Sequence, residues 1–190
     1  MPIKSGLSWV GWANANAVNS KDIEDLEATF KQNVKDFKKA LEDAGATVAV
    51  TATKRSKRRA YLFHWSWKIA LGKSKASEAT AMTGVDIQWD HGNVAQSKAG
   101  AQQMVTGFGL AVPPQSNNAP ALTSRHIEGK AIDMNITWTG KIKVKNKTGQ
   151  DVEVTFNTNV NQNTVLHTIG KSYGVIKLAS DAPHWSTDGH

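Results

Sequence analysis

The chain has 190 residues, a mass of 20.6 kDa, and 23 Lys/Arg against 16 Asp/Glu, which give a formal net charge of +7. This length suits a single compact domain with a sizeable buried core, and no stretch approaches the run of about 18 apolar residues that a membrane helix needs. The chain has no cysteine, which excludes disulfides, thiolate zinc sites and cysteine nucleophiles. Any catalytic metal must therefore be held by histidine and carboxylate.

The first Lys or Arg is Lys4, but no continuous apolar segment follows it, so the N-terminus does not resemble a secretory signal. We therefore expect synthesis in a cytoplasm. The clearest helix is predicted over residues 20–43, where apolar residues recur at steps of three and four. Asn19 or Ser20 is the expected N-cap. Residues 47–53 are rich in β-branched residues and predict a strand.

A second helix is expected from about Ser56 to Leu71. This helix contains four aromatic residues, Tyr61, Phe63, Trp65 and Trp67. They suit either core packing or a surface on which a ligand stacks, and core packing is favoured. Residues 72–92 predict a long loop or broken helix, and residues 95–107 a short helix. Residues 112–120 contain three prolines and predict a loop.

The second half of the chain predicts mostly strands. Residues 130–138 favour a strand, and 141–145 with 152–156 alternate apolar and polar residues around a turn, as a hairpin does. A helix is expected over residues 162–173. Helices early and an antiparallel sheet later predict an α+β fold. We expect one domain over residues 1–190, with helices packed on one side of the sheet, a core at about 45–187 and an N-terminal helical segment at 1–44.

The excess positive charge lies in residues 1–75 and is densest at Lys54–Arg59. A basic face suits a polyanionic partner such as nucleic acid, an anionic membrane surface or an acidic wall polymer, although a solvated helix start explains it equally well. No helix-turn-helix, zinc-finger or RNP-type motif accompanies the charge, so nucleic-acid binding is not expected.

Two segments carry residues suited to metal chemistry. His126 and Asp133 offer a nitrogen and an oxygen ligand, and their spacing suits a loop feeding a strand, with Gly129 permitting the bend. His184 is the candidate third ligand from far along the chain. Two histidines and one carboxylate leave one position of a tetrahedral zinc site free for water, as catalytic sites do. Asp181 lies three residues before His184 and is the candidate general base.

The first segment matches every specified position of the motif SxHxxGxAxD: Ser124, His126, Gly129, Ala131 and Asp133. It resembles the zinc peptidases that cut peptidoglycan, a family that includes D-alanyl-D-alanine carboxypeptidases, D-Ala-D-Ala dipeptidases and phage L-alanyl-D-glutamate endopeptidases. The segment from Asp181 to Trp185 is similar to the second motif of that family, an acidic residue followed by His-Trp. The resemblance covers roughly residues 47–60 and 120–187.

The resemblance implies one Zn²⁺ per chain, with His126, Asp133 and His184 as ligands and Asp181 as base. It also implies an arginine after an early strand that binds substrate or the oxyanion, and Arg55 is the candidate. Arg58 and Arg59 are the neighbouring alternatives. A lysine stands before Arg55 where members often have tyrosine, and Asp181 replaces the glutamate of many members.

The function implied is hydrolysis of an amide bond in the peptide stem of peptidoglycan. We expect a monomeric phage endolysin that is made in the host cytoplasm and reaches the cell wall after release, with Lys54–Arg59 contacting the anionic wall or outer-membrane surface. The alternatives are a tail-associated wall-penetrating peptidase, a D-Ala-D-Ala dipeptidase or carboxypeptidase, and a non-catalytic module that binds the wall or nucleic acid.

Several further residues have more than one interpretation. Ser124 is expected to orient its loop by hydrogen bonding, and Trp185 either walls the site or packs in the core, with the wall favoured. Glu128 is an alternative base, although a solvated loop glutamate is favoured. Asp90 and His91 are a weaker metal candidate that more often marks a turn. Other histidines have no partners at ligand spacing, and residues 186–190 are expected to be a frayed end.

Overall fold

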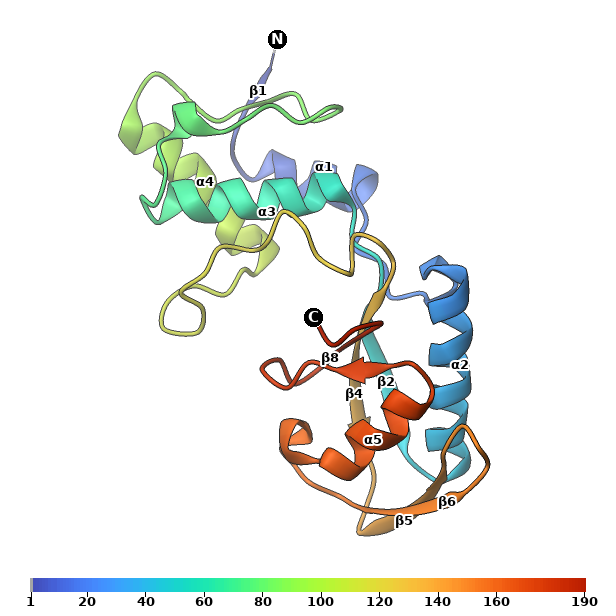
Figure 1. Cartoon of the computed structure of the whole chain (residues 1–190). Helices are drawn as coiled ribbons and strands as arrows, with labels where there is room; N and C mark the ends of the chain where they lie inside the picture. The colour runs from blue at the N-terminus through green and yellow to red at the C-terminus, as the bar shows by residue number, and fades with distance from the viewer. Residues whose placement is uncertain (1) are drawn as a thin grey trace. The chain divides into compact units, whose positions relative to one another are not determined.

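A computed structural model describes residues 2–190 and has an α+β fold (Figure 1). Five α-helices are present in this range: α1 Ser8–Asn16, α2 Ala28–Asp43, α3 Lys57–Ala70, α4 Val94–Phe108 and α5 Thr164–Ser172. The strands of the same range are β1 Ile3–Lys4, β2 Thr47–Ala52, β3 Ile87–Gln88, β4 Ala131–Thr137, β5 Lys141–Lys145, β6 Asp151–Thr155, β7 Ile176–Lys177 and β8 His184–Ser186.

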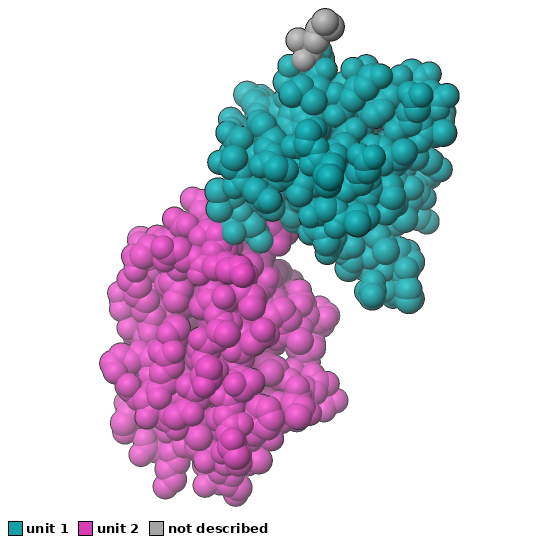
Figure 2. All heavy atoms as spheres, turned by 180° about the vertical axis from the view of Figure 1, so that it is seen from behind, with its two compact units in different colours: residues 1–19, 56–123 teal, residues 20–55, 124–190 magenta. Residues whose placement is uncertain are grey.

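The chain divides into two compact units (Figure 2). Unit 1 consists of residues 1–19 and 56–123, and unit 2 of residues 20–55 and 124–190. The expected single domain, with a core at about 45–187 and an N-terminal helical segment at 1–44, stays a prediction. Within unit 2, the apolar face of α2 packs into the same core as β4.

Unit 2 is built on a four-stranded antiparallel sheet in the order β2-β4-β8-β7. Alternate residues of β4 are fully buried on one face of the sheet, as expected for a strand with period 2. This face and the helices α2 and α5 form one hydrophobic core, which includes Phe30, Val34, Phe37, Leu41, Ile132, Met134, Ile136, Leu166, Ile169 and Trp185. The expected antiparallel sheet covered by helices on one side is confirmed.

The N-terminal boundary of α2 was predicted wrongly. Asp22 caps a 3₁₀ turn at Ile23–Asp25, and the Glu27 carboxylate then accepts the backbone N–H groups of Thr29 and Phe30. Two successive caps therefore interrupt the expected helix, and α2 begins at Ala28 rather than near residue 20. The Ser20 hydroxyl accepts the backbone N–H of Asp22 and does not cap α2.

Unit 1 consists of α1, α3 and α4 with the short parallel β1–β3 pair. Most of the aromatic residues of α3 are buried, and Tyr61 and Trp65 belong to a second hydrophobic core with Trp9, Trp89 and Met104. Core packing is therefore the role of these rings, as favoured from sequence. The helix α1 was not predicted because its buried residues, Trp9 and Ala13, do not continue into a longer apolar stripe.

The remaining elements agree closely with expectation. Ser56 caps α3 through the Arg58 backbone N–H, and β5 pairs with β6 as the predicted hairpin. The predicted helix at 162–173 is a 3₁₀ turn at Val160–Gln162 followed by α5. No helix within residues 2–190 is both long and apolar enough to cross a bilayer.

Gly170 provides a test of the packing between α5 and the sheet. A Cβ atom at this position would lie 2.6 Å from Cζ3 of Trp185 and 2.7 Å from the carbonyl oxygen of Val175. Because overpacking of this kind typically costs about 1–3 kcal/mol, Gly170→Ala is expected to lower the free energy of unfolding by that amount in chemical denaturation.

The matched control is Thr168→Ala on the exposed face of α5. Surface substitutions usually change stability by about 0.5 kcal/mol or less, so this variant should unfold nearly as the wild type does. Equal stability of the two variants would contradict the packing described for Gly170.

Candidate metal centre

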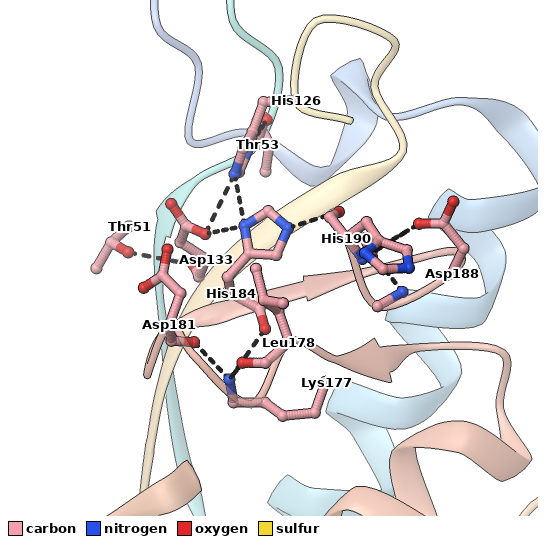
Figure 3. A network of polar contacts seen from close by, with 12 residues as sticks. Thr51, Thr53, His126, Asp133, Lys177, Leu178, Asp181, His184, Asp188 and His190 are labelled. Carbon is pink, nitrogen blue, oxygen red and sulfur yellow. Dashed lines mark hydrogen bonds and ion pairs between the residues drawn. The ribbon is translucent and has the colours of Figure 1, made fainter. Parts of the chain in front are cut away.

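Three side chains that are distant in sequence converge in unit 2: His126, Asp133 and His184 (Figure 3). Nε2 of His126 lies 3.2 Å from Oδ1 of Asp133 and 3.2 Å from Nδ1 of His184. The third side of the triangle, from Nδ1 of His184 to Oδ1 of Asp133, measures 3.1 Å. Both histidines are buried and Asp133 is partly buried.

This spacing fits one metal ion. Ligand atoms that lie about 2.0–2.1 Å from a tetrahedral ion are separated from one another by about 3.3 Å. The three observed separations are close to this value, so one ion can contact all three atoms with little movement of the side chains. The structure thus confirms that the three predicted ligands come together.

Two of the ligands are placed by strand pairing. Asp133 on β4 stands directly opposite His184 on β8, and opposite residues of an antiparallel pair point to the same face of the sheet. Their neighbours Ile132 and Trp185 form the next opposite pair and point into the core. Because side chains alternate along both strands, the two ligands lie on one face of the sheet and the two core residues lie on the other.

The third ligand lies on the loop that leads into β4. Gly129 in this loop has φ +70°, and a Cβ there would approach the backbone N of Glu27 to 3.1 Å, which supports the expected need for glycine. The carbonyl oxygen of His126 accepts hydrogen bonds from the backbone N–H groups of Gly129 and Arg55, at 3.2 and 3.0 Å. The loop is thus fastened to the segment that follows β2.

Each histidine ring is oriented by a hydrogen bond from its other nitrogen. Nδ1 of His126 lies 2.6 Å from the carbonyl oxygen of Thr53, and Nε2 of His184 lies 3.1 Å from that of His190. A carbonyl can only accept, so both nitrogens carry the proton and donate it. This leaves the lone pairs of His126 Nε2 and His184 Nδ1 directed at the centre of the triangle, as metal-binding histidines require.

The electrostatics agree with this geometry. Without a metal, the nitrogens of His126 and His184 that face Asp133 can instead take up a proton and donate it to the carboxylate. Burial favours the neutral acid of Asp133, but these hydrogen bonds outweigh it and hold the pKa of this carboxyl well below its usual range. Burial also opposes the charged form of His184, yet the hydrogen bond with Asp133 and the nearby charge of Asp181 raise the pKa of its imidazole. The cluster therefore favours positive charge at its centre.

The C-terminal residues take part in the centre, whereas a frayed end was expected. The buried hydroxyl of Ser186 accepts the backbone N–H groups of Gly189 and His190, at 2.9 and 3.0 Å. Asp188 forms an ion pair with Arg125. This turn returns the chain so that the His190 carbonyl meets the ring of His184, a contact that no sequence pattern indicated.

The structure places both predicted catalytic residues in unit 2 with the cluster. Asp181 is exposed, and its carboxylate lies on the side of its loop that faces Asp133 (Figure 3). Arg55 follows the end of β2. Burial lowers the pKa of its guanidinium, and the charge of Asp133 opposes this effect. Arg55 is therefore close enough to interact electrostatically with the predicted metal ligand Asp133. Arg58 and Arg59 belong to unit 1, where Arg59 donates to the carbonyl oxygens of Ala13 and Ala17.

Two other expectations differ from the structure. The Ser124 hydroxyl is buried and has no hydrogen-bond partner within residues 2–190, so it does not orient its loop in the way expected. The Trp185 side chain is 0% exposed and packs against Phe37 in the core, with ring centroids 5.5 Å apart. Trp185 therefore supports β8 from behind and does not wall the site, because its position alternates with that of His184.

The weaker candidates take the structural roles favoured from sequence. Glu128 is exposed and pairs with Arg125 and Lys130. Asp90 and His91 form a turn in which the Asp90 carboxylate accepts the Gly92 N–H. Among the described residues, the cluster of His126, Asp133 and His184 is the only group of three or more potential ligands.

Comparisons with known proteins give no assignment: no family model, curated protein or solved structure matches the chain. The resemblance to peptidoglycan peptidases therefore rests on the two motifs, and the structure adds the geometry of their side chains.

The raised pKa of His184 predicts how metal binding depends on pH. Nδ1 must be unprotonated to act as a ligand, so protons compete with the metal. Affinity for Zn²⁺ should be full above the raised pKa and should fall as the pH drops through it, starting above the ordinary histidine value of about 6.5. Competition with a chelator, measured across neutral pH, checks this. A pH-independent affinity would be inconsistent with Nδ1 as a ligand.

The hydrogen bonds of Ser186 provide a second prediction. Ser186→Ala removes the nearer of two acceptors of the His190 backbone N–H, at 3.0 Å, and leaves the Asp188 carboxylate at 3.3 Å. The His190 carbonyl should then hold the ring of His184 less firmly. Since changes to the partners of ligand histidines cost about 10–100-fold in metal affinity, Zn²⁺ affinity should fall within that range. The exposed Ser180→Ala should bind Zn²⁺ as the wild type does, and equal affinity of the two variants would show that the turn does not support the ligand.

Proposed function

We propose that this protein is a zinc-dependent peptidase that hydrolyses an amide bond in the peptide stem of bacterial peptidoglycan. The observation that carries the proposal is the 3.1–3.2 Å triangle of His126, Asp133 and His184. Its three atoms come from the positions that the two peptidase motifs specify. Two further residues of the first motif are consistent with it, since Gly129 makes the bend and Ala131 is fully buried.

Zinc is the proposed metal because of the donor set. Two imidazole nitrogens and one carboxylate oxygen suit a borderline ion, and three protein ligands are typical of catalytic rather than structural zinc. When bound, zinc supplies Lewis acidity that polarises an amide carbonyl and makes a water molecule more acidic.

Asp181 is the proposed general base. Its carboxylate is exposed, lies on the β7–β8 loop beside the cluster (Figure 3), and contributes to the field that acts on His184. It would take a proton from the attacking water and later pass that proton to the leaving amine. Arg55 would bind a substrate carboxylate or the developing oxyanion, which is consistent with its electrostatic coupling to Asp133.

Within this class we place the protein among phage endolysins that cut the L-alanyl-D-glutamate bond or a D,D-bond. The net charge of +7 supports contact with an anionic wall. Lys54, Lys57 and Arg58 are the exposed basic residues of the Lys54–Arg59 segment.

The proposal is tested with purified protein and isolated peptidoglycan. The wild type should bind about one Zn²⁺ per chain and release new free amino groups, and chelation should stop the release until zinc is restored. Mass spectrometry of the released muropeptides identifies the bond, and release of only terminal D-Ala or D-Ala-D-Ala would replace the endolysin assignment by a carboxypeptidase or dipeptidase.

Substitutions separate the roles of metal and base. His126→Ala should lose both zinc and activity. Asp181→Asn should keep zinc and lose about 10²–10⁴-fold in kcat, since a general base contributes in this range. The control is Asp86→Asn, an exposed carboxylate of unit 1. A fully active Asp181→Asn variant would refute the assigned base, and zinc-bound wild type that leaves peptidoglycan intact would refute the function.

A further inference from the structure

Lys177 is a buried cation that the proposed chemistry does not use. It lies on the edge strand β7 and is 8% exposed, although lysine is rarely buried without compensating partners. The sequence gives no sign of this, because Lys177 ends a short apolar run with no motif around it.

All three N–H groups of the Lys177 ammonium find an acceptor. Nζ donates to the backbone carbonyl oxygens of Leu178, Asp181 and His184, the last at 3.2 Å (Figure 3). An ammonium has three donors and no acceptor, so its hydrogen-bonding capacity is filled by the backbone of one loop. A group in this state is not available to a substrate, which excludes a direct catalytic role.

The loop held in this way carries two residues of the proposed site. Asp181 and His184 are also joined by local turn bonds, from the His184 N–H to the Asp181 carbonyl at 3.1 Å and from the Asp181 N–H to the Leu178 carbonyl at 3.2 Å. Lys177 adds a cross-link that spans the loop from its first residue to the metal ligand. The relative placement of the Asp181 carboxylate and the His184 imidazole therefore depends on the Lys177 side chain together with these backbone bonds.

The cross-link is itself attached to the hydrophobic core. Lys177 stands opposite Trp185 in the β7–β8 pair, and its Nζ lies 5.7 Å from the centroid of the Trp185 ring, within cation–π range. Trp185 is in turn fixed against Phe37 and Gly170. A rigid part of the fold thus holds an otherwise exposed loop.

We propose that Lys177 is a positioning residue that holds the 178–184 loop so that Asp181 and His184 act on the same metal-centred site. The part that concerns Asp181 rests on the proposed function, whereas the part that concerns His184 rests on the metal centre alone. Lys177 acts through the backbone and does not touch the substrate.

The test uses Lys177→Met in the full chain, which keeps an aliphatic stem but removes the three donors. Zn²⁺ alone is the probe, with affinity measured by chelator competition. We expect about 10–100-fold weaker Zn²⁺ binding, the range for lost support of a metal ligand, and faster hydrogen exchange of the Asp181 and His184 amides in the metal-free protein. On peptidoglycan at saturating zinc, kcat should fall with little change in KM.

The control is Lys171→Met, which removes an exposed lysine from the last turn of α5. Folded Lys177→Met that binds Zn²⁺ with wild-type affinity would overturn the proposal, even if its melting temperature fell, because lowered stability alone indicates only a structural role. If Lys177→Met does not fold, Lys177→Gln replaces it in the test. This variant retains two N–H donors and should show a smaller loss of Zn²⁺ affinity. Wild-type affinity in Lys177→Gln would also overturn the proposal. Since these readouts need no peptidoglycan, inactive wild type would count against the proposed function and not against the role of Lys177.

Discussion

The antiparallel register between β4 and β8 is the constraint on which the metal centre depends. It sets Asp133 opposite His184 and, one position along, Ile132 opposite Trp185. A shift of one residue would exchange the two faces, placing the ligands in the core and the apolar side chains at the site. The burial of Trp185 between the sheet, α2 and α5 makes such a shift costly, because a fully buried large apolar side chain stabilises the fold by about 1.5–3 kcal/mol. Packing of Trp185 and Ile132 in the core thus keeps Asp133 and His184 together on the opposite face of the sheet.

Backbone carbonyls connect this sheet to the rest of the centre. The carbonyl of Thr53 orients His126, the carbonyl of His190 orients His184, and three carbonyls of the 178–184 loop surround Lys177. Support by the backbone needs a particular conformation rather than a particular residue. Part of the geometry around the ligands is consequently built by residues outside the two motifs, namely Thr53, Lys177 and His190.

Sequence reasoning succeeded where a residue type itself determines the structure. Histidine, aspartate and glycine at motif spacing indicated the three ligands and the bend at Gly129. Periodicity indicated α2, β-branched residues indicated β2, and α3, α4 and β4 were also expected close to their observed bounds. It missed β8, which is three residues long, and the Ser186 turn, because both depend on tertiary pairing. It misjudged the start of α2, where Asp22 and Glu27 form competing caps, and the role of Trp185, where strand alternation outweighs adjacency to His184. No local pattern indicates which segments pack together over long range, as residues 2–19 do with segments more than 35 residues away.

The central claim is that two imidazoles and one carboxylate share one zinc ion with a coordination position left for solvent. X-ray absorption spectroscopy of the zinc-loaded protein measures this directly. Our account predicts a first shell of nitrogen and oxygen atoms only, at about 2.0–2.1 Å, with two imidazoles in the wild type and one in His184→Ala. A third imidazole in the shell, or the same two imidazoles in His184→Ala as in the wild type, would contradict it.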